Sequence, residues 1–230
     1  MIKNYSNIIY GISKKTDGQM ILRYGSLALI NRRRFFADKG IDIGNVVSAN
    51  LVHGNRVGIV SAKEKGTDIA DTDGLITSEK GICLSITISD CLPIFFYDHK
   101  REIIGLAHAG WRGVISKIAV SLVKRMNSEF YSNPEDIEVY VGPHLQKCHF
   151  EITKELLPEF VKYNGLVNYV DNRIFIDLAE IVKRDLIKEN LLDDNIEISP
   201  VCTYCDASYF SYRRDKPEGP VSQIAYICLV

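Results

Sequence analysis

Residues 102–126 read EIIGLAHAGWRGVISKIAVSLVKRM, and two segments of different periodicity meet in the middle of this stretch. The first, residues 102–108, is an apolar run that is typical of a buried strand. Beyond Gly113, apolar residues recur at the spacing of an amphipathic helix. They are Ile115, Ile118, Ala119, Leu122 and Met126. Residues 108–113, HAGWRG, are therefore predicted to form a strand-to-helix turn, which carries the only Trp of the chain.

The segments around this turn indicate a fold with many strands and short connections. From Gly81 to Ser89, apolar residues alternate with Cys83, Ser85, Thr87 and Ser89, as in a strand with one buried face and one exposed face. The apolar run of residues 92–98 is separated from residues 102–108 only by the polar segment HKR, so a hairpin is the shortest connection. Further strands are predicted at residues 7–13, 46–53, 137–142 and 223–230.

Three other segments are predicted to be helical, at residues 26–40, 155–163 and 177–191. The last begins with Asp177 and has Glu180 three residues later, which resembles a capping box. On the first, Arg32, Arg33 and Arg34 are expected to lie on a solvated face, with a phosphate contact as the alternative. Because strands outnumber helices and several are hairpin-linked, a mixed α+β fold is favoured over a doubly wound parallel sheet. No repeat or linker divides the chain, so residues 1–230 are expected to form a single domain.

The composition is ordinary for a protein that folds in water, with 46% hydrophobic and 25% charged residues. That balance excludes disordered, collagen-like and disulfide-dense chains. The net charge of −1 produces no field that would attract nucleic acid or an anionic membrane, so a small-molecule partner is expected. The sequence shows neither a signal peptide nor an apolar membrane span, which predicts a cytoplasmic protein. Its six cysteines are scattered through apolar segments and are expected to be reduced thiols.

Three residues that can bind a metal or act in catalysis stand at predicted strand ends. His53 directly precedes Gly54, His108 lies two residues before Gly110, and Cys91 follows the strand that ends at Ser89. A thiolate and two imidazoles can hold Zn²⁺ and leave a fourth position open for water or substrate. Alternatively, Cys91 is a nucleophile whose pKa is lowered by a histidine. The spacing of the residues does not choose between these mechanisms.

The HAGWRG turn also offers a place for an anion. Arg112 and Gly113 precede the predicted helix, whose first backbone N–H groups are unpaired and whose dipole is positive at that end. This arrangement suits phosphate, because the glycine allows the backbone to approach closely. The alternative is that Arg112 pairs with a carboxylate, Asp90 or Asp98. Trp111 either stacks on a flat base or fills the core.

A CxxC motif, Cys202 to Cys205, is either a redox pair or half of a zinc-binding knuckle. Cys148 and His149 are the residues that would complete a structural metal site with it. Downstream, Arg213 belongs to the segment FSYRRD. This segment is either a second basic wall of a pocket or an ion-paired turn.

Taken together, six motifs resemble the laccase-domain, or polyphenol-oxidase-like, family, which includes purine nucleoside phosphorylases and peptidoglycan-editing factors. The motifs are LVHGNRV (51–57), DTDGLIT (71–77), SDCLPIFFYD (89–98), HAGWRG (108–113), GPHLQKCHFEI (142–152) and CTYCDASYFSYRRD (202–215). They follow the order and approximate spacing of the family, and the resemblance spans residues 8–229.

The resemblance implies a mixed α/β sandwich, with central β-sheets flanked by helices, similar in shape to the deamidase domain of cytotoxic necrotising toxins. It implies cleavage of adenosine, inosine, guanosine or methylthioadenosine by phosphate, and deamination of adenosine. His53, Cys91 and His108 match the metal and catalytic positions of the family, so Zn²⁺ is the expected cofactor. From position alone, the residues expected to contact substrate or phosphate are Asp90, Arg112, Gly113 and Arg213.

Other functions remain open at this point. A metal-free Cys–His amidase acting on peptidoglycan precursors would use the second mechanism, as the toxin relatives do. A redox protein would depend on Cys202 and Cys205, and a binding module would hold nucleoside without converting it. Copper-dependent oxidation of phenols is disfavoured, because the chain has five histidines and no His-x-His motif.

Overall fold

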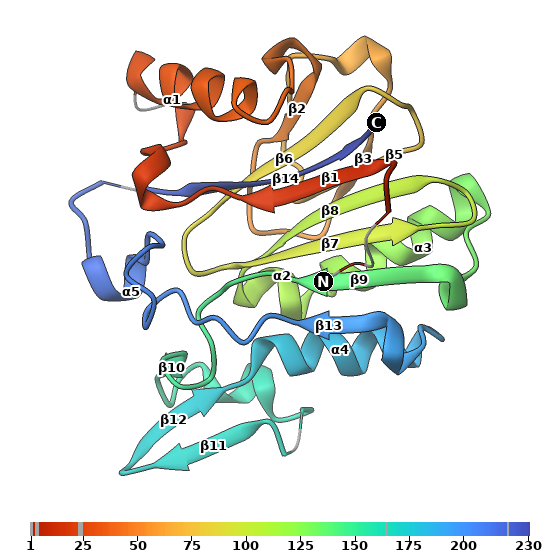
Figure 1. The fold of residues 1–230 in the computed structure, drawn as a ribbon. Helices are drawn as coiled ribbons and strands as arrows, with labels where there is room; N and C mark the ends of the chain where they lie inside the picture. The colour runs from red at the N-terminus through yellow and green to blue at the C-terminus, as the bar shows by residue number, and fades with distance from the viewer. Residues whose placement is uncertain (1, 3–4, 23–24, 164, 220) are drawn as a thin grey trace.

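Two β-sheets stacked face to face form the centre of the molecule in the computed structural model (Figure 1). The structure describes residues 2, 5–22, 25–163, 165–219 and 221–230. The strands of the described residues are β1 (Ile8–Ile12), β2 (Val46–Ala49), β3 (Val57–Ile59), β4 (Asp68–Ile69), β5 (Gly74–Thr77), β6 (Ile82–Ile88), β7 (Leu92–Asp98), β8 (Ile103–Ala109), β9 (Ile137–Val141), β10 (Glu151–Ile152), β11 (Val167–Val170), β12 (Arg173–Ile176), β13 (Ile196–Ile198) and β14 (Gln223–Leu229). The α-helices are α1 (Ser26–Ala37), α2 (Trp111–Ile115), α3 (Ile118–Phe130), α4 (Leu178–Lys188) and α5 (Tyr212–Asp215).

The strand order shows how distant segments of the chain meet. One large sheet has the order β1-β14-β6-β2-β4, and the other has the order β13-β9-β7-β8-β5-β3. A small third sheet, β10-β12-β11, projects at the lower end of Figure 1. Both parallel and antiparallel pairs occur in each large sheet. The prediction of a mixed α+β fold is therefore confirmed.

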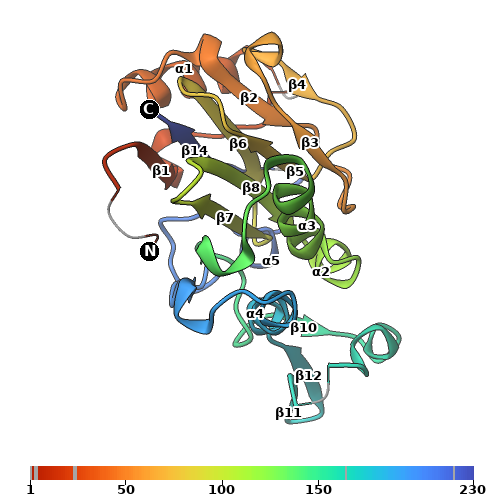
Figure 2. The ribbon, with the colours of Figure 1, turned by 90° about the vertical axis from the view of Figure 1, so that its right-hand side faces the viewer.

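Helices cover the outer faces of the two sheets, so the molecule has four layers (Figure 2). Between the sheets, Leu84 of β6 and Phe95 of β7 belong to one buried apolar cluster. On one outer face, Phe36 of α1 packs with Tyr226 of β14. On the other, Leu122 of α3 lies in a cluster with residues of α2, α4 and the second sheet. Each such side chain contributes roughly 1.5–3 kcal/mol when it is fully buried. The expected sandwich of sheets flanked by helices is confirmed.

The predicted hairpin between residues 92–98 and 102–108 is also confirmed, and it positions two candidate site residues. β7 and β8 are antiparallel, with Leu92 opposite Ala109 and Pro93 opposite His108. Cys91 immediately precedes β7. Because β7 and β8 are antiparallel, Cys91 lies close to the last residues of β8.

The helix predicted after Gly113 consists of two shorter helices. It starts earlier than expected, because α2 begins at Trp111, and it breaks at Lys117, whose φ of 64° is left-handed. Arg112 and Gly113 therefore lie inside α2 and do not precede it. The expected helix at 155–163 is a 3₁₀ turn, Leu157–Phe160, with Pro158 in its first turn.

The remaining helices follow the sequence pattern more closely. Asp177 caps α4 by accepting a hydrogen bond from the backbone N–H of Glu180 at 3.0 Å. α1 ends three residues before Gly40, which adopts a left-handed φ of 71°. Among the described residues, no helix is both long and apolar enough to cross a membrane.

Two predictions about the contact between α1 and the first sheet are wrong. Cys83 and Ser85, expected on an exposed face of β6, are buried because α1 covers that face. Arg32 of α1, expected in solvent, is buried for the same reason. Cys83 also faces Cys228 in the register of β6 and β14, and a disulfide joins them. The expectation of reduced thiols therefore fails for this pair.

Candidate active site

The structure brings His53, Cys91 and His108 together. One ring nitrogen of each histidine and the Cys91 Sγ all lie within 4.8 Å of one another. The two imidazole rings meet edge to face, with their centroids 4.8 Å apart. Cys91 lies just before β7 and His108 lies in β8, whereas His53 comes from the loop between β2 and β3. His53 was expected at a strand end, but β2 ends at Ala49 and the chain bends through a left-handed φ of 62° at His53.

Asp73, which sequence reasoning did not select, links the two histidines. Its Oδ1 accepts a hydrogen bond from His108 Nδ1 at 2.9 Å and another from the backbone N–H of His53 at 2.9 Å. Its Oδ2 accepts from the backbone N–H groups of Val52 and Gly54, at 3.2 and 2.8 Å. The carboxylate is fully buried, so these bonds fix the position of the His53 loop against His108.

The same contacts determine the charges of this group. Burial opposes ionisation of Asp73, but the hydrogen bonds from His108 and Gly54 hold its pKa below the ordinary value. Burial would raise the pKa of Cys91, yet His108 and His53 lower it to about 6. Burial would lower the pKa of His108, yet Cys91 and Asp73 raise it to about 9. The arrangement therefore favours a thiolate at Cys91 beside a protonated His108 near neutral pH.

Gly110 leaves room for the cluster. A Cβ atom at this position would lie 3.0 Å from His53 Cδ2 and 3.2 Å from Cys91 Sγ. Its φ of −72° is accessible to any residue, so the constraint is the close approach and not the backbone conformation. The second glycine of HAGWRG, Gly113, is buried against the backbone oxygen of Gly54.

The cluster faces a cavity of about 460 Å³. This volume is within the range of small-molecule sites. The cavity lies between the first sheet, the loop before β10 and the segment containing α5. Besides the cluster, its lining includes Arg32, Asn50, Asp68, Leu145, Phe150 and Tyr212. A molecule in the cavity would therefore meet both the His/Cys cluster and a buried arginine.

Two of the predicted substrate contacts, Asp90 and Arg213, line this cavity. Asp90 adopts a left-handed φ of 78°, and its carboxylate accepts hydrogen bonds from Thr203 Oγ1 at 2.6 Å and the backbone N–H of Arg213 at 2.7 Å. The Arg213 guanidinium donates to the carbonyl oxygens of His149 and Glu151, each at 3.1 Å. Asp90 and Arg213 thus join the wall of the cavity to neighbouring loops.

The other two predicted contacts lie elsewhere. Arg112 and Gly113 do not belong to the described lining of the cavity. The Arg112 guanidinium stacks on the Trp111 ring, 4.2 Å from its centroid. Trp111 itself is partly buried and packs against the core cluster beneath the second sheet. Trp111 was expected either to stack on a flat base or to fill the core, and the structure favours the position in the core.

Arg32 is a cavity residue that sequence reasoning placed in solvent. It donates to the carbonyl oxygen of Met20 at 2.7 Å and to Ser48 Oγ at 3.0 Å, and burial lowers its pKa to about 10. The helical period carried the missing signal, because the buried residues of α1 follow i, i+3, i+4, i+7 and i+8 spacing. They are Ala28, Asn31, Arg32, Phe35 and Phe36.

Comparison with known families agrees with the resemblance that the six sequence motifs indicated. A family model described as "Multi-copper polyphenol oxidoreductase laccase" matches residues 28–229. The chain belongs to this family. The resemblance inferred from the six motifs is confirmed.

Family members and solved structures extend the likeness over most of the chain. Purine nucleoside phosphorylase YlmD of Bacillus subtilis is 28% identical over 93% of this chain and 86% of its own. Adenosine deaminase RL5, from an unknown prokaryotic organism, is 29% identical over 76% of this chain and 72% of its own. The crystal structure of YlmD from Geobacillus stearothermophilus has a TM-score of 0.92 at 26% identity and covers 98% of this chain and 93% of its own. The hypothetical protein YfiH of Bacillus licheniformis has a TM-score of 0.93 at 25% identity, with coverage of 100% and 96%.

The donor set of the cluster fits a metal ion. Two imidazole nitrogens and one thiolate are ligands that zinc and copper both accept. Three protein ligands beside a cavity leave a coordination position that faces a bound molecule, which is the arrangement of catalytic sites. Asp73 bonds the Nδ1 of His108 and so directs its other ring nitrogen to the cluster, as carboxylates beside metal-binding histidines do.

Proposed function

We propose that this protein is a zinc-dependent purine nucleoside phosphorylase that also deaminates adenosine. The observation that carries the proposal is the cluster of His53, Cys91 and His108, anchored by Asp73 and open to a cavity large enough for a nucleoside. The names of its relatives, purine nucleoside phosphorylases and an adenosine deaminase, support the same class of substrate. We expect the substrate to be a purine nucleoside together with phosphate, and the protein to be cytoplasmic.

In this proposal the three cluster residues would hold zinc through Cys91 Sγ and the ring nitrogens of both histidines. When bound, zinc would be a Lewis acid that could polarise a substrate oxygen during phosphorolysis, and it would lower the pKa of the water molecule that deamination needs. Asp73 would hold the His108 ring in the orientation that binding requires. Binding at neutral pH would release the proton that His108 otherwise keeps, so zinc affinity should fall as the solution becomes acidic.

In phosphorolysis a phosphate oxygen forms a bond to C1′ of the ribose while the bond from C1′ to the purine nitrogen breaks. The purine nitrogen takes up the proton that the phosphate loses, so the products are the neutral base and ribose 1-phosphate. The two arginines that line the cavity, Arg32 and Arg213, would bind the phosphate and orient it. A guanidinium has five N–H donors, and the bonds from Arg32 to Met20 and Ser48 use two of these groups. Asp90 would accept a hydrogen bond from a sugar hydroxyl. Arg112 and Gly113, which lie off the cavity, remain predictions from sequence position alone.

The proposal can be tested with the purified full-length chain and adenosine, with and without phosphate. Adenine, hypoxanthine and inosine are separated by chromatography, and zinc is measured in the same sample. We expect adenine only with phosphate, and inosine in both conditions. Cys91→Ala should abolish both products, whereas His99→Ala should not, because His99 lies outside the cavity with its Nδ1 against the backbone of Asp136. Absence of phosphate-dependent base release from every purine nucleoside would contradict the proposal.

A second candidate is a metal-free Cys–His hydrolase acting on peptidoglycan precursors. The lowered pKa of Cys91 and the raised pKa of His108, together with the bond from His108 to Asp73, favour it. Such an enzyme would keep its activity after treatment with a chelator, whereas the zinc enzyme would lose it and regain it with added zinc. Copper-dependent oxidation of phenols, which the family description suggests, would require copper in the metal analysis.

A further inference from the structure

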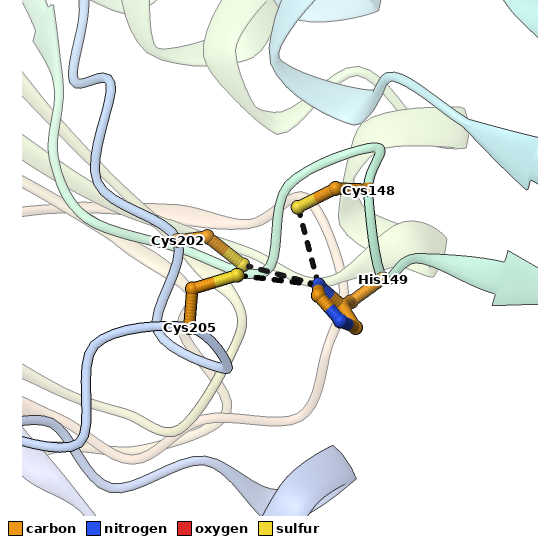
Figure 3. A group of neighbouring side chains, drawn as sticks. All are labelled: Cys148, His149, Cys202 and Cys205. Atoms are coloured by element: carbon orange, nitrogen blue, oxygen red, sulfur yellow. Dashed lines mark hydrogen bonds between the residues drawn. The ribbon is translucent and has the colours of Figure 1, made fainter.

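Four metal-ligating side chains gather outside the active site, where two loops meet (Figure 3). Cys148 and His149 lie between β9 and β10, and Cys202 and Cys205 lie between β13 and α5. The three sulfur atoms surround His149 Nδ1, at 3.2 Å for Cys148, 3.5 Å for Cys205 and 4.0 Å for Cys202. All four ligand atoms lie within 4.8 Å of one another. We call these four residues the Cys₃His cluster.

We propose that the Cys₃His cluster holds a structural zinc ion. Zinc–sulfur bonds of about 2.3 Å and zinc–nitrogen bonds of about 2.0–2.1 Å in a tetrahedron place sulfur and nitrogen roughly 3.6 Å apart. The distances of 3.2, 3.5 and 4.0 Å scatter around that value, so the ion needs only small side-chain shifts. Three cysteines and one histidine form a donor set found in structural zinc sites.

The ligands are held in place by their own loops. Two backbone hydrogen bonds close these loops: the His149 N–H donates to the carbonyl oxygen of Gln146, and the Asp206 N–H donates to the carbonyl oxygen of Cys202, both at 2.9 Å. The Tyr204 ring stacks on the imidazole of His149, with the centroids 3.9 Å apart, which keeps Nδ1 directed at the sulfurs.

The number of ligands and their exposure indicate a structural role for the ion. Four protein ligands fill a tetrahedral shell, so no coordination position is left for a substrate. Cys148 and Cys205 are exposed and Cys202 is buried, so an ion can reach the cluster from solvent. Once bound, the ion would link the two loops. These loops are distant in sequence, and the parallel bridge between His144 and Cys202 already brings them side by side.

The cluster lies directly behind the wall of the active-site cavity. Thr203, between the two cysteines of the CxxC motif, donates to the Asp90 carboxylate, which precedes Cys91 in the chain. The Arg213 guanidinium donates to the carbonyl oxygen of His149, and Phe150 next to it lines the cavity. Zinc would therefore fix the positions of Asp90 and Arg213. Only this consequence for the cavity rests on the proposed function, because zinc binding at the cluster can be measured without a substrate.

The test is a count of zinc per chain in the full-length protein, purified with a thiol reductant and transferred to metal-free buffer. We expect Cys91→Ala, which lacks the active-site thiolate, to retain one zinc ion per chain, and Cys91→Ala/Cys205→Ser to retain none. Cobalt added to zinc-depleted Cys91→Ala should give a thiolate-to-metal absorption band that saturates at one equivalent. His53→Ala, altered in an exposed loop, provides a second background in case Cys91→Ala misfolds. Circular dichroism checks the fold of each variant.

A matched pair of histidine variants, both made in the Cys91→Ala background, separates ligand loss from general damage. His149→Ala should weaken zinc binding at least about tenfold, whereas His99→Ala should leave it unchanged. The inference is overturned if folded Cys91→Ala and His53→Ala bind no zinc, or if two of the cluster cysteines are recovered as a disulfide under these conditions. If the wild-type chain holds one zinc ion that Cys205→Ser loses and Cys91→Ala keeps, the active-site proposal fails and this inference stands.

Discussion

The cluster of His53, Cys91 and His108, called here the active-site cluster, uses the same donors as the Cys₃His cluster, imidazole and thiolate. The two clusters differ in what surrounds them. The first has three donor residues and faces a cavity of about 460 Å³. The second has four donor residues, two of them exposed, and no described residue of it lines that cavity. The comparison indicates that the chemistry of a His/Cys cluster depends less on its ligands than on whether a position next to them is open to a substrate.

The two clusters are also held by different groups. A fully buried carboxylate, Asp73, anchors the active-site histidines. Backbone hydrogen bonds within the two loops and the Tyr204 ring stacked on His149 hold the other cluster. A carboxylate favours a positive charge on its histidine and raises the pKa of that histidine, whereas a stacked ring and amide–carbonyl bonds add no charge. The first arrangement suits proton and substrate chemistry, and the second suits a permanent structural contact.

The largest expected difference between the clusters is in activity. Cys91→Ala should lower kcat/KM for a purine nucleoside by a factor on the order of 10³ or more, because it removes a ligand of the zinc ion that would act on the substrate. Cys205→Ser should raise KM only a few-fold, about 1 kcal/mol in binding, because it loosens the cavity wall. Steady-state kinetics with both variants checks this prediction. Equal losses would mean that the two clusters do not have separate roles.

The second difference is in thiol reactivity after metal is removed by chelation. Cys91, with its pKa lowered to about 6, should be alkylated at a constant rate above that pH and more slowly below it, as the thiolate gains a proton. Burial and the neighbouring Cys202 raise the pKa of Cys148 to about 12. At pH 7 we expect Cys91 to react about 10²- to 10³-fold faster, after allowing for the greater nucleophilicity of a more basic thiolate.

Iodoacetamide labelling across a pH series, followed by peptide mass spectrometry, measures both rates. His108→Ala should shift the inflection of Cys91 upward, because His108 is the main group that stabilises its thiolate. An inflection that stays near pH 6 in this variant would contradict the assigned cause.

The third prediction concerns Asp73, which has no counterpart in the Cys₃His cluster. Each of the two Asp73 oxygens accepts two hydrogen bonds. Asp73→Asn would replace one oxygen by an NH₂ group, which would then face N–H donors. We expect activity or active-site zinc affinity to fall about 10- to 100-fold. The free energy of unfolding should fall by roughly 1.5–3 kcal/mol. Asp71→Asn, at an exposed neighbouring position, is the control for kinetics and urea denaturation, and it should match the wild type. Zinc at the Cys₃His cluster should be retained in both.

The smallest expected effect is steric. In Gly110→Ala, the new methyl group would lie 3.0 Å from His53 Cδ2 and must displace the His53 ring slightly. We expect kcat/KM to fall about tenfold, because small misplacements at a reacting centre reduce rates. Gly219→Ala, which has no atoms within 4 Å of the new Cβ, should be neutral. An unchanged rate in Gly110→Ala would show that the His53 ring is free to move.

The sequence predicted those parts of the fold and site that depend on local patterns. The apolar runs and the HKR turn predicted the β7–β8 hairpin, and this hairpin brings Cys91 beside His108. His53 was selected because it precedes a glycine, although it lies in a loop. The break at Lys117 was not predicted, because apolar spacing continues through it and the left-handed φ depends on how α2 and α3 pack.

Features that depend on contacts between distant segments were missed or left open. Asp73 stands in the quoted DTDG motif, but nothing local indicates that it accepts bonds from the loop near residue 53 and from His108. Arg32 was placed in solvent although the period of its helix puts it beside Phe35 and Phe36. The Cys₃His cluster joins residues more than 50 positions apart, so the CxxC motif alone indicated only half of it.

The central claim is that the open three-ligand cluster carries out phosphorolysis. Its most direct test is the initial rate of hypoxanthine release from inosine by the zinc-loaded protein, measured as a function of phosphate concentration. The account predicts a rate that rises and saturates with phosphate, with ribose 1-phosphate formed in equal amount, and no release by Cys91→Ala. Release that does not depend on phosphate, or that persists in Cys91→Ala, would contradict it.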